Sequence, residues 1–344
     1  RSSGAPVRGG TFKHLLAGSS LPHLDVSSPP GNVYISPQVF RRLVSGRACY
    51  YEDVMMEPDL ARSWQVSPDG RVWTFKLRED VRWHNKPPVN GRQLTADDVA
   101  WTIDHQKREG GLQSYWANVT HEQPDPFTIV LRMPDPDADL LGKLGQNNNV
   151  ILAREVKEQF KDFKSVGIGT GPFMVKEFKT DQFTLLERNP DWKEMGEDGK
   201  PLPYIDNLQV FLGSDYAAEV AAMRTGAVDL NGVQGFRKLD ADLLKQSNPK
   251  LIGYNDTVAA VWGLHVNHGR PPFGDPRVRK AFMMAIDRDT IVKQLMPGDG
   301  IAEKLNATDA EKIGFSAYIW NFTLIKSIIP LLRGKKIVVG GPHV

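Results

Sequence analysis

The strongest regular pattern in the chain is the alternation of apolar and polar residues that is typical of half-buried β-strands. Every second residue from Trp73 to Leu77 is large and apolar, and the turn-forming Ser67–Gly70 segment comes just before. We therefore predict a hairpin whose second arm covers residues 71–78. Similar patterns predict strands at 9–16, 127–131, 173–178, 183–188 and 208–212, with 179–182 as the turn of a second hairpin.

Helices are indicated by an acidic or hydroxyl residue placed just before an apolar face with helical spacing. Thr95 precedes such a face, and we assign the acidic pair Asp97 and Asp98 to the capped first turn rather than to acid/base catalysis. Residues 215–225 form a second predicted helix, closed by Gly226. Asp275 followed by Pro276 begins a third, and 287–295 a fourth.

Strands and helices therefore mix along the chain, which predicts an α/β fold made of mixed α+β lobes. At 344 residues the chain is longer than one hydrophobic core usually serves, and 40% hydrophobic residues is ordinary globular usage. Alternating strands dominate before residue 212 and helices follow it. We expect residues 9–255 to form a mixed-sheet lobe that carries a small inserted domain.

Charge and composition exclude several classes of function. Lys and Arg total 43 against 41 Asp and Glu, so the charge of +2 does not indicate a nucleic-acid partner. No run of about 18 apolar residues predicts a transmembrane helix. The single cysteine, Cys49, rules out an internal disulfide and a multi-cysteine metal site, and we interpret it as a small buried residue. The chain begins at Arg1 without a leader, so we expect any export signal to lie outside it.

Motifs of known chemistry are incomplete. The Gly-rich segment 167–172 ends in Pro172 where a dinucleotide site needs its third glycine, so we predict a turn that enters a strand. His121 and Glu122, which we expect in a loop, lack the second histidine of a zinc protease motif. Nucleophile elbows and phosphate loops do not occur. The sequence therefore predicts no enzyme, no catalytic residues and no cofactor.

Metal binding is weighed at His265 and His268, which are three residues apart. Both would face one metal ion only in a helical backbone, whereas the alternation from Trp262 to Asn267 favours the end of a strand. We predict no metal site here and keep a metal site as the less favoured alternative.

An ordered series of segments resembles the family 5 extracellular solute-binding proteins, which bind oligopeptides, dipeptides, nickel complexes and related solutes. The first runs from Pro58-Asp59-Leu60-Ala61-Arg62-Ser63-Trp64 through Ser67–Gly70 to Trp83-His84. The others are 94–99, 169–173, 185–192, 223–229 and 267–287. Each segment is weak alone, but their joint order is specific. The resemblance covers residues 9 to 300.

The resemblance implies a clamshell of the periplasmic-binding-protein type II kind. In it, a core lobe (1–45 and 165–255) carries an inserted small domain (46–164), and a truncated second lobe begins over 256–300. The implied protein is the extracytoplasmic substrate-binding component of an ABC importer. It captures oligopeptides or a related small solute between two lobes, and domain closure signals to an ABC permease in the membrane. We further expect a monomer in the periplasm or at the cell surface.

Ligand contacts follow by family position. These positions are Ser19, Ser20, Leu21, Asn147, Asn148, Asn149, Gly263, Leu264 and His265, to which we add Tyr50. Side-chain amides pair with peptide backbones, and an aromatic face tolerates varied side chains. The alternative, that Tyr50 and the asparagine run are ordinary surface residues, stays open. Because the family's opposite lobe lies beyond this chain, we expect only weak binding of dipeptides or tripeptides.

The last segment differs from the rest. Residues 312–318 and 336–343 predict strands on either side of a helix at 321–332, a β-α-β unit. This unit resembles the cobalamin-binding domain of radical SAM enzymes, although the Asp-x-His-x-x-Gly motif that ligates cobalamin is absent. We interpret residues 301–344 as an unrelated fragment joined at the turn-rich 297–300. The alternative function is a fragment of a cobalamin-binding radical SAM enzyme, carried by the tail alone.

Overall fold

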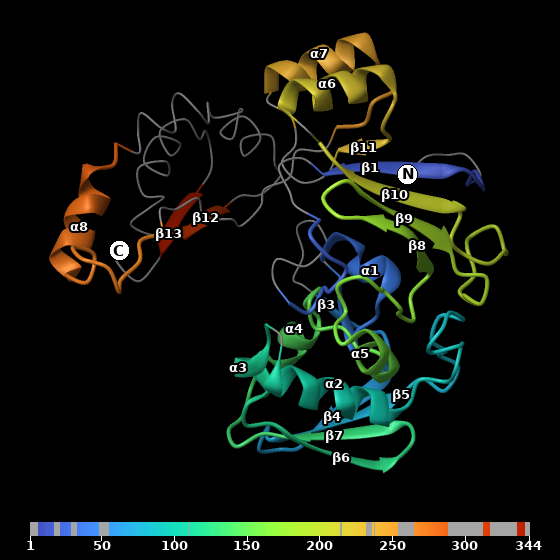
Figure 1. The fold of residues 1–344 in the computed structure, drawn as a ribbon. Coiled ribbons are helices and arrows are strands. Elements are labelled where there is room, and N and C mark those ends of the chain that lie inside the picture. Colours follow the sequence, from blue (N-terminus) through green and yellow to red (C-terminus); the bar gives the residue numbers. More distant parts are fainter. Residues whose placement is uncertain are drawn as a thin grey trace. The chain divides into compact units, whose positions relative to one another are not determined.

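The computed structural model describes residues 6–16, 21–28, 33–47, 55–109, 111–213, 215–231, 236, 238–253, 265–287, 312–316 and 336–340. The chain divides into two compact units, Arg1–Tyr254 and Asn255–Val344. The first unit contains two mixed layers of sheet and helix (Figure 1). Cys49 and the predicted helix at 287–295 lie largely outside the described residues.

A five-stranded sheet is the first layer of this unit. Its strands run in the order β11 (Leu230–Asn231), β1 (Thr11–Leu16), β10 (Asn207–Leu212), β9 (Phe183–Arg188) and β8 (Phe173–Lys179). The β1 strand is parallel to both of its neighbours, whereas β9 is antiparallel to β10 and to β8. The predicted strands and the hairpin with its turn at 179–182 are confirmed.

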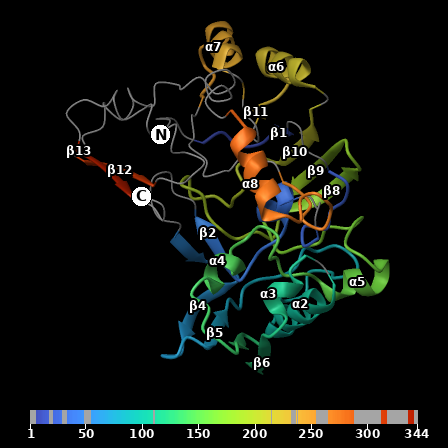
Figure 2. The ribbon, with the colours of Figure 1, turned by 90° about the vertical axis from the view of Figure 1, so that its left-hand side faces the viewer.

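Two helices cover the β11 and β1 side of this sheet. They are α6 (Tyr216–Thr225) and α7 (Lys238–Ser247), and both lie beside those strands in the two views (Figures 1 and 2). Asp215 caps α6 by accepting a hydrogen bond from the Ala218 amide at 2.9 Å. Gly226 ends the helix in the left-handed conformation, with φ of 69°. The predicted start and end of this helix are confirmed.

The second layer is a four-stranded antiparallel sheet in the order β4 (Ala61–Val66), β5 (Val72–Leu77), β7 (Thr128–Arg132) and β6 (Thr120–Asp125). The predicted β4–β5 hairpin is confirmed, with the Ser67 amide bonded to the Val72 carbonyl at 2.9 Å. The prediction of a loop at His121 and Glu122 is wrong, because both residues lie on β6. This strand is polar on both faces and pairs through its backbone, so it lacks an apolar pattern.

The helix α2 (Ala96–Arg108) packs on this second sheet and has the predicted cap. The Asp98 carboxylate accepts a hydrogen bond from the Thr95 amide at 3.0 Å. It is buried and also pairs with Arg92 at 2.6 Å, so its structural role is complete. Asp98 therefore caps and anchors the helix, as the sequence predicted.

Short elements connect the two sheets. They are η1 (Val33–Ile35), α1 (Ser36–Val39), the antiparallel pair β2 (Val44–Arg47) and β3 (Met55–Pro58), α3 (Gln113–Trp116), α4 (Leu140–Leu144) and α5 (Arg154–Phe160). One hydrophobic core runs from Leu16 and Val210 of the first sheet to Phe75 and Ile129 of the second. The two sheets of this unit therefore share a continuous core and hold the loops between them in fixed positions.

The second unit contains α8 (Pro276–Ala285) and a parallel strand pair, β12 (Lys312–Ser316) with β13 (Lys336–Gly340). Asp275 caps α8 by accepting from the Arg277 amide at 2.8 Å, as predicted. The parallel pairing is the arrangement expected of the two strands of a β-α-β unit. The helix predicted at 321–332 lies outside the described residues. Within the part of the chain that is described, no helix is long and apolar enough to cross a membrane.

Candidate functional site

Half of the predicted ligand contacts fall outside the described residues: Ser19, Ser20, Tyr50, Gly263 and Leu264. Leu21 is described, and its side chain is fully buried in the core. Its amide donates to the Asp181 carboxylate at 3.0 Å, and its carbonyl accepts from the Asp181 amide at 2.9 Å. Leu21 thus fastens the segment after β1 to the β8–β9 turn.

The asparagine run at 147–149 is held mainly by structural contacts. Arg42 donates to the Asn147 side chain at 2.5 Å, and the Ser36 hydroxyl donates to the Asn147 carbonyl. Asn149 is buried and donates to the Lys143 carbonyl at 3.1 Å. Asn148 is half-buried, and no hydrogen bond is recorded for its side chain. Of the three, Asn148 alone has its amide free for a ligand.

His265 belongs to the second unit and is exposed. Residues 265–267 have no regular secondary structure, and His268 begins a turn. Among the described residues there is no group of three or more His, Cys, Asp or Glu side chains placed to hold a metal ion.

Unpaired buried polar groups gather on β1 and β11, which sequence reasoning missed. The Nε2 atom of His14 and both polar atoms of the Asn231 amide are buried without a hydrogen-bond partner. Leu15 pairs with Asn231 and His14 with Leu230, so the two polar side chains come from adjacent strand positions and point to opposite faces of the sheet. Burial lowers the pKa of His14, which favours the neutral imidazole.

Buried polar groups without partners are uncommon in proteins, because each one costs the free energy of its lost hydration. In open sheets with parallel strands, ligands bind beyond the carboxyl ends of those strands. Asn231 is the last residue of β11, and its carboxyl end lies beside that of β1. The signal in the sequence is a polar residue that closes a short apolar strand. We call the end of β11 that carries Asn231 the strand-end surface; His14 lies on the opposite face of the sheet.

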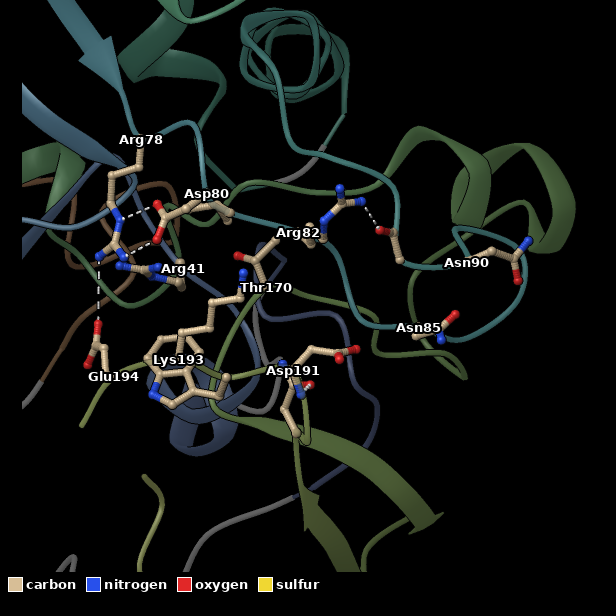
Figure 3. A pocket seen from close by; sticks show the side chains of 14 residues that line it. Arg41, Arg78, Asp80, Arg82, Asn85, Asn90, Thr170, Asp191, Lys193 and Glu194 are labelled. Carbon is tan, nitrogen blue, oxygen red and sulfur yellow. Dashed lines mark hydrogen bonds and ion pairs between the residues drawn. The ribbon is translucent and has the colours of Figure 1, made fainter. Parts of the chain in front are cut away.

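A polar cleft lies elsewhere in the first unit and has a volume of about 280 Å³. One wall is the loop after β5, which contributes Asp80, Arg82, Asn85 and Asn90 (Figure 3). The opposite wall is the segment 189–194 after β9, and Thr170 lies between the two walls. Segments about a hundred residues apart in sequence thus form one cleft.

Ion pairs fix the inner end of this cleft. Arg41 and Asp59 form a buried pair, and the Arg41 guanidinium lies 5.2 Å from the centre of the Trp192 ring. Arg78 bonds Asp80 at 2.9 and 3.1 Å. Hydrogen bonds from Arg78 hold the pKa of Asp80 below its usual value. The side chains at this end are therefore engaged with each other.

The Gly-rich segment 167–172 passes behind the cleft and is clamped by His84. The His84 amide donates to the Gly169 carbonyl at 2.9 Å, and the Gly169 amide donates to Nδ1 of His84 at 3.2 Å. Nε2 of His84 lies 3.0 Å from the Gly171 carbonyl and donates to it. The segment leads directly into β8, as the sequence predicted, and its glycines serve close packing instead of a phosphate.

Comparison with known proteins gives a consistent result. The family model for "Bacterial extracellular solute-binding proteins, family 5 Middle" matches residues 55–310. An ABC transporter peptide-binding protein of Brucella ovis is 32% identical over 256 residues, covering 70% of this chain and 44% of the relative. The dipeptide-binding protein of Escherichia coli is 26% identical over 270 residues, covering 72% and 49%. The chain spans about half the length of these curated relatives.

Solved structures share the fold. The periplasmic binding protein DppA of Helicobacter pylori, in complex with the peptide STSA, superposes with a TM-score of 0.66 at 20% identity, covering 98% of this chain and 74% of its own. The oligopeptide-binding protein AppA of Bacillus subtilis, in complex with a nonapeptide, gives 0.67 at 18% identity, covering 98% and 75%. The predicted α/β fold of the type II binding-protein kind is confirmed. The chain belongs to the bacterial extracellular solute-binding proteins of family 5.

Proposed function

We propose that this chain is part of the substrate-binding component of an ABC importer, which captures oligopeptides or a related small solute and delivers it to the membrane permease. The observation that carries the proposal is the family match over residues 55–310. Relatives named for peptide binding and for ABC transport support peptides as the solute. Heme-binding protein A of Haemophilus influenzae, 28% identical over 293 residues, shows that relatives also bind other solutes.

The strand-end surface is the place where we propose that the solute meets this lobe. Asn231 offers one amide donor and one acceptor, both without partners. A peptide backbone presents the same pair of groups at each residue, so it can satisfy them in turn. The predicted contacts Ser19 and Ser20 come shortly after β1 in sequence, outside the described residues, and we keep them as proposed contacts.

We propose the same division into lobes that the sequence predicted. Residues 1–45 and 165–255 form the core lobe that holds the strand-end surface, 46–164 form the inserted domain, and 256–300 begin the second lobe. The composition of the two sheets supports this division, since the five-stranded sheet takes its strands from the first set and the four-stranded sheet from the second. Closure of the lobes on the solute, rather than bond chemistry, is the proposed mechanism. We propose a monomer that works outside the cytoplasm.

The test is a binding measurement on the protein purified from its source organism. With the second lobe present, we expect trialanine to bind with a micromolar dissociation constant in calorimetry, and to bind more weakly to the 344-residue chain alone, where only one lobe contacts it. Asn231→Ala should weaken binding about tenfold in either case, because one amide pair with the backbone is lost. Asn248→Ala, at the end of α7, is the matched control and is expected to leave the affinity unchanged. The proposal fails if neither trialanine nor longer alanine peptides bind, or if the Asn231 variant binds as tightly as the wild type.

The tail carries a separate proposal, that residues 301–344 come from another family and are not part of the receptor. The family match covers the first ten residues of this tail and ends at residue 310, so the match supports a foreign origin only for 311–344, where β12 and β13 pair in parallel. We propose the resemblance to cobalamin-binding domains as its origin. A parent reading frame that continues with a C-x-x-x-C-x-x-C cluster would support that origin, and one that continues into a second receptor lobe would contradict it.

Deletion of residues 301–344 tests the same point by stability. If the tail is foreign, the melting temperature of the remaining chain should change by less than about 2 °C, because the core of the receptor lobe gains nothing from the tail. Solubility should improve. A drop of 5 °C or more in the melting temperature would show that the tail belongs to the fold.

A further inference from the structure

The polar cleft holds two opposite charges that the fold leaves unused. The Asp191 carboxylate and the Lys193 ammonium both line it, and neither has an ion-pair or hydrogen-bond partner among the described residues. Both come from the segment after β9, and Figure 3 shows them on the same wall of the cleft. The other acids of the cleft, Asp80 and Glu194, are already paired with Arg78.

The charges of the cleft balance, which decides the kind of ligand. Arg41 is neutralised from behind by Asp59, and Arg78 by the two acids that it contacts. Across the cleft from Lys193, Arg82 bonds only the Gly91 carbonyl, at 3.1 Å. A simple anion would be repelled by the unpaired carboxylate of Asp191, and a simple cation would be repelled by the ammonium of Lys193. A ligand that carries one charge of each sign satisfies both.

Uncharged groups around the two charges are also free to bind. Thr170 is buried, lines the cleft, and has no recorded hydrogen bond for its hydroxyl. The Asn85 side chain on the opposite wall is likewise unbonded. Asn189 is buried beneath, and its side-chain oxygen Oδ1 accepts from the Asp191 backbone amide at 3.0 Å, which fixes the backbone that carries Asp191. The site is therefore built on an anchored segment.

We propose that this cleft is a second binding site, for small zwitterions that carry an ammonium and a carboxylate group. The ammonium of the ligand lies against Asp191, and its carboxylate lies against Lys193. The Thr170 hydroxyl and the Asn85 amide meet the polar groups between them. Free amino acids and the two ends of a short peptide share this chemistry. The site is distinct from the strand-end surface and does not depend on the proposed peptide site.

Titration with L-alanine and its two blocked forms tests the proposal on the whole 344-residue chain. Alanine should bind with a dissociation constant on the order of 1 mM, as two charge-assisted hydrogen bonds in an open cleft allow. N-acetylalanine lacks the ammonium and alanine amide lacks the carboxylate, so each should bind about tenfold more weakly. Dialanine distinguishes the two kinds of ligand. If it binds as tightly as alanine, the site accepts the ends of short peptides; if it binds more weakly, the site is specific for free amino acids.

Two variants locate the effect in the cleft. Asp191→Asn should abolish the preference for alanine over N-acetylalanine, and Lys193→Gln should abolish the preference over alanine amide. Glu158→Gln and Lys164→Gln, which lie outside the cleft, are matched controls and should keep both preferences. The proposal is overturned if alanine and its blocked forms bind equally, if none of them binds, or if either cleft variant keeps the wild-type preferences. Trialanine binding at the strand-end surface should be the same in all four variants.

Discussion

Replacing Gly169 by alanine is expected to lower the free energy of unfolding by about 3 kcal/mol or more, or to prevent folding. A Cβ atom on this residue would stand 1.9 Å from the carbonyl oxygen of Val39 and 2.7 Å from its carbonyl carbon. Both are backbone atoms at the end of α1, so no rotamer change can make room. Either the 167–172 segment or α1 must move, and a movement of the segment also breaks the clamp to His84.

Chemical denaturation of the two proteins measures this effect. Gly142→Ala is the control, since Gly142 lies in α4 and a Cβ there meets nothing within 4 Å. The control is expected to raise stability by up to about 1 kcal/mol, because alanine favours a helix over glycine. If Gly169→Ala were as stable as wild type, the close approach of the Gly-rich segment to α1 would be wrong.

Most of the regular elements could be predicted because their signals are local. The alternation at 71–78 and the hairpin at 173–188 depend only on residues next to each other in sequence. The caps at Thr95, Asp215 and Asp275 likewise combine a capping residue with a nearby helical face. The strand β6 was missed because its apolar signal is absent, although its backbone pairs with β7.

The candidate sites could not be predicted in the same way, because they depend on contacts between distant residues. The cleft places Arg82 and Asn85 opposite Asp191 and Lys193, and neither segment contains a sequence pattern that indicates contact with the other. Leu15 and Asn231 are more than two hundred residues apart, and only the parallel pairing of β1 with β11 places them side by side. Leu21 and Asn149 were predicted as ligand contacts from family position alone. In the fold both residues are buried, and the Leu21 amide and the Asn149 side chain make hydrogen bonds within the protein.

Acid is expected to destabilise the first unit through His84. Burial lowers the pKa of His84 to about 4, with a smaller contribution from Lys86, while the bond to the Gly171 carbonyl opposes the shift. The unfolded chain has the ordinary value of about 6.5 and binds the proton first. The stability that the neutral ring provides is therefore complete above pH 6.5 and is lost as the pH falls toward 4. The total loss is on the order of 3 kcal/mol, at about 1.4 kcal/mol for each pH unit.

The contacts of the His84 ring explain why the folded protein favours its neutral form. Protonation would place a hydrogen on Nδ1, which then faces the Gly169 amide donor 3.2 Å away. His84→Asn keeps an acceptor near the Nδ1 position and cannot be protonated, but it loses the bond to Gly171. We expect the variant to be less stable at pH 7 by about 1–3 kcal/mol, and to lose less stability than wild type between pH 6.5 and 4.

The difference between the two proteins isolates His84, because other buried histidines titrate in both. Burial also lowers the pKa values of His14 and His105, and their contributions cancel in the comparison. Denaturant titrations at half-unit steps of pH give the two stability curves. The curves should converge as the pH falls, since only the wild type must keep a buried imidazole neutral. Parallel curves from pH 6.5 to 4 would mean that His84 takes up its proton as readily in the fold as in the unfolded chain, and that the clamp on the Gly-rich segment does not depend on a neutral ring.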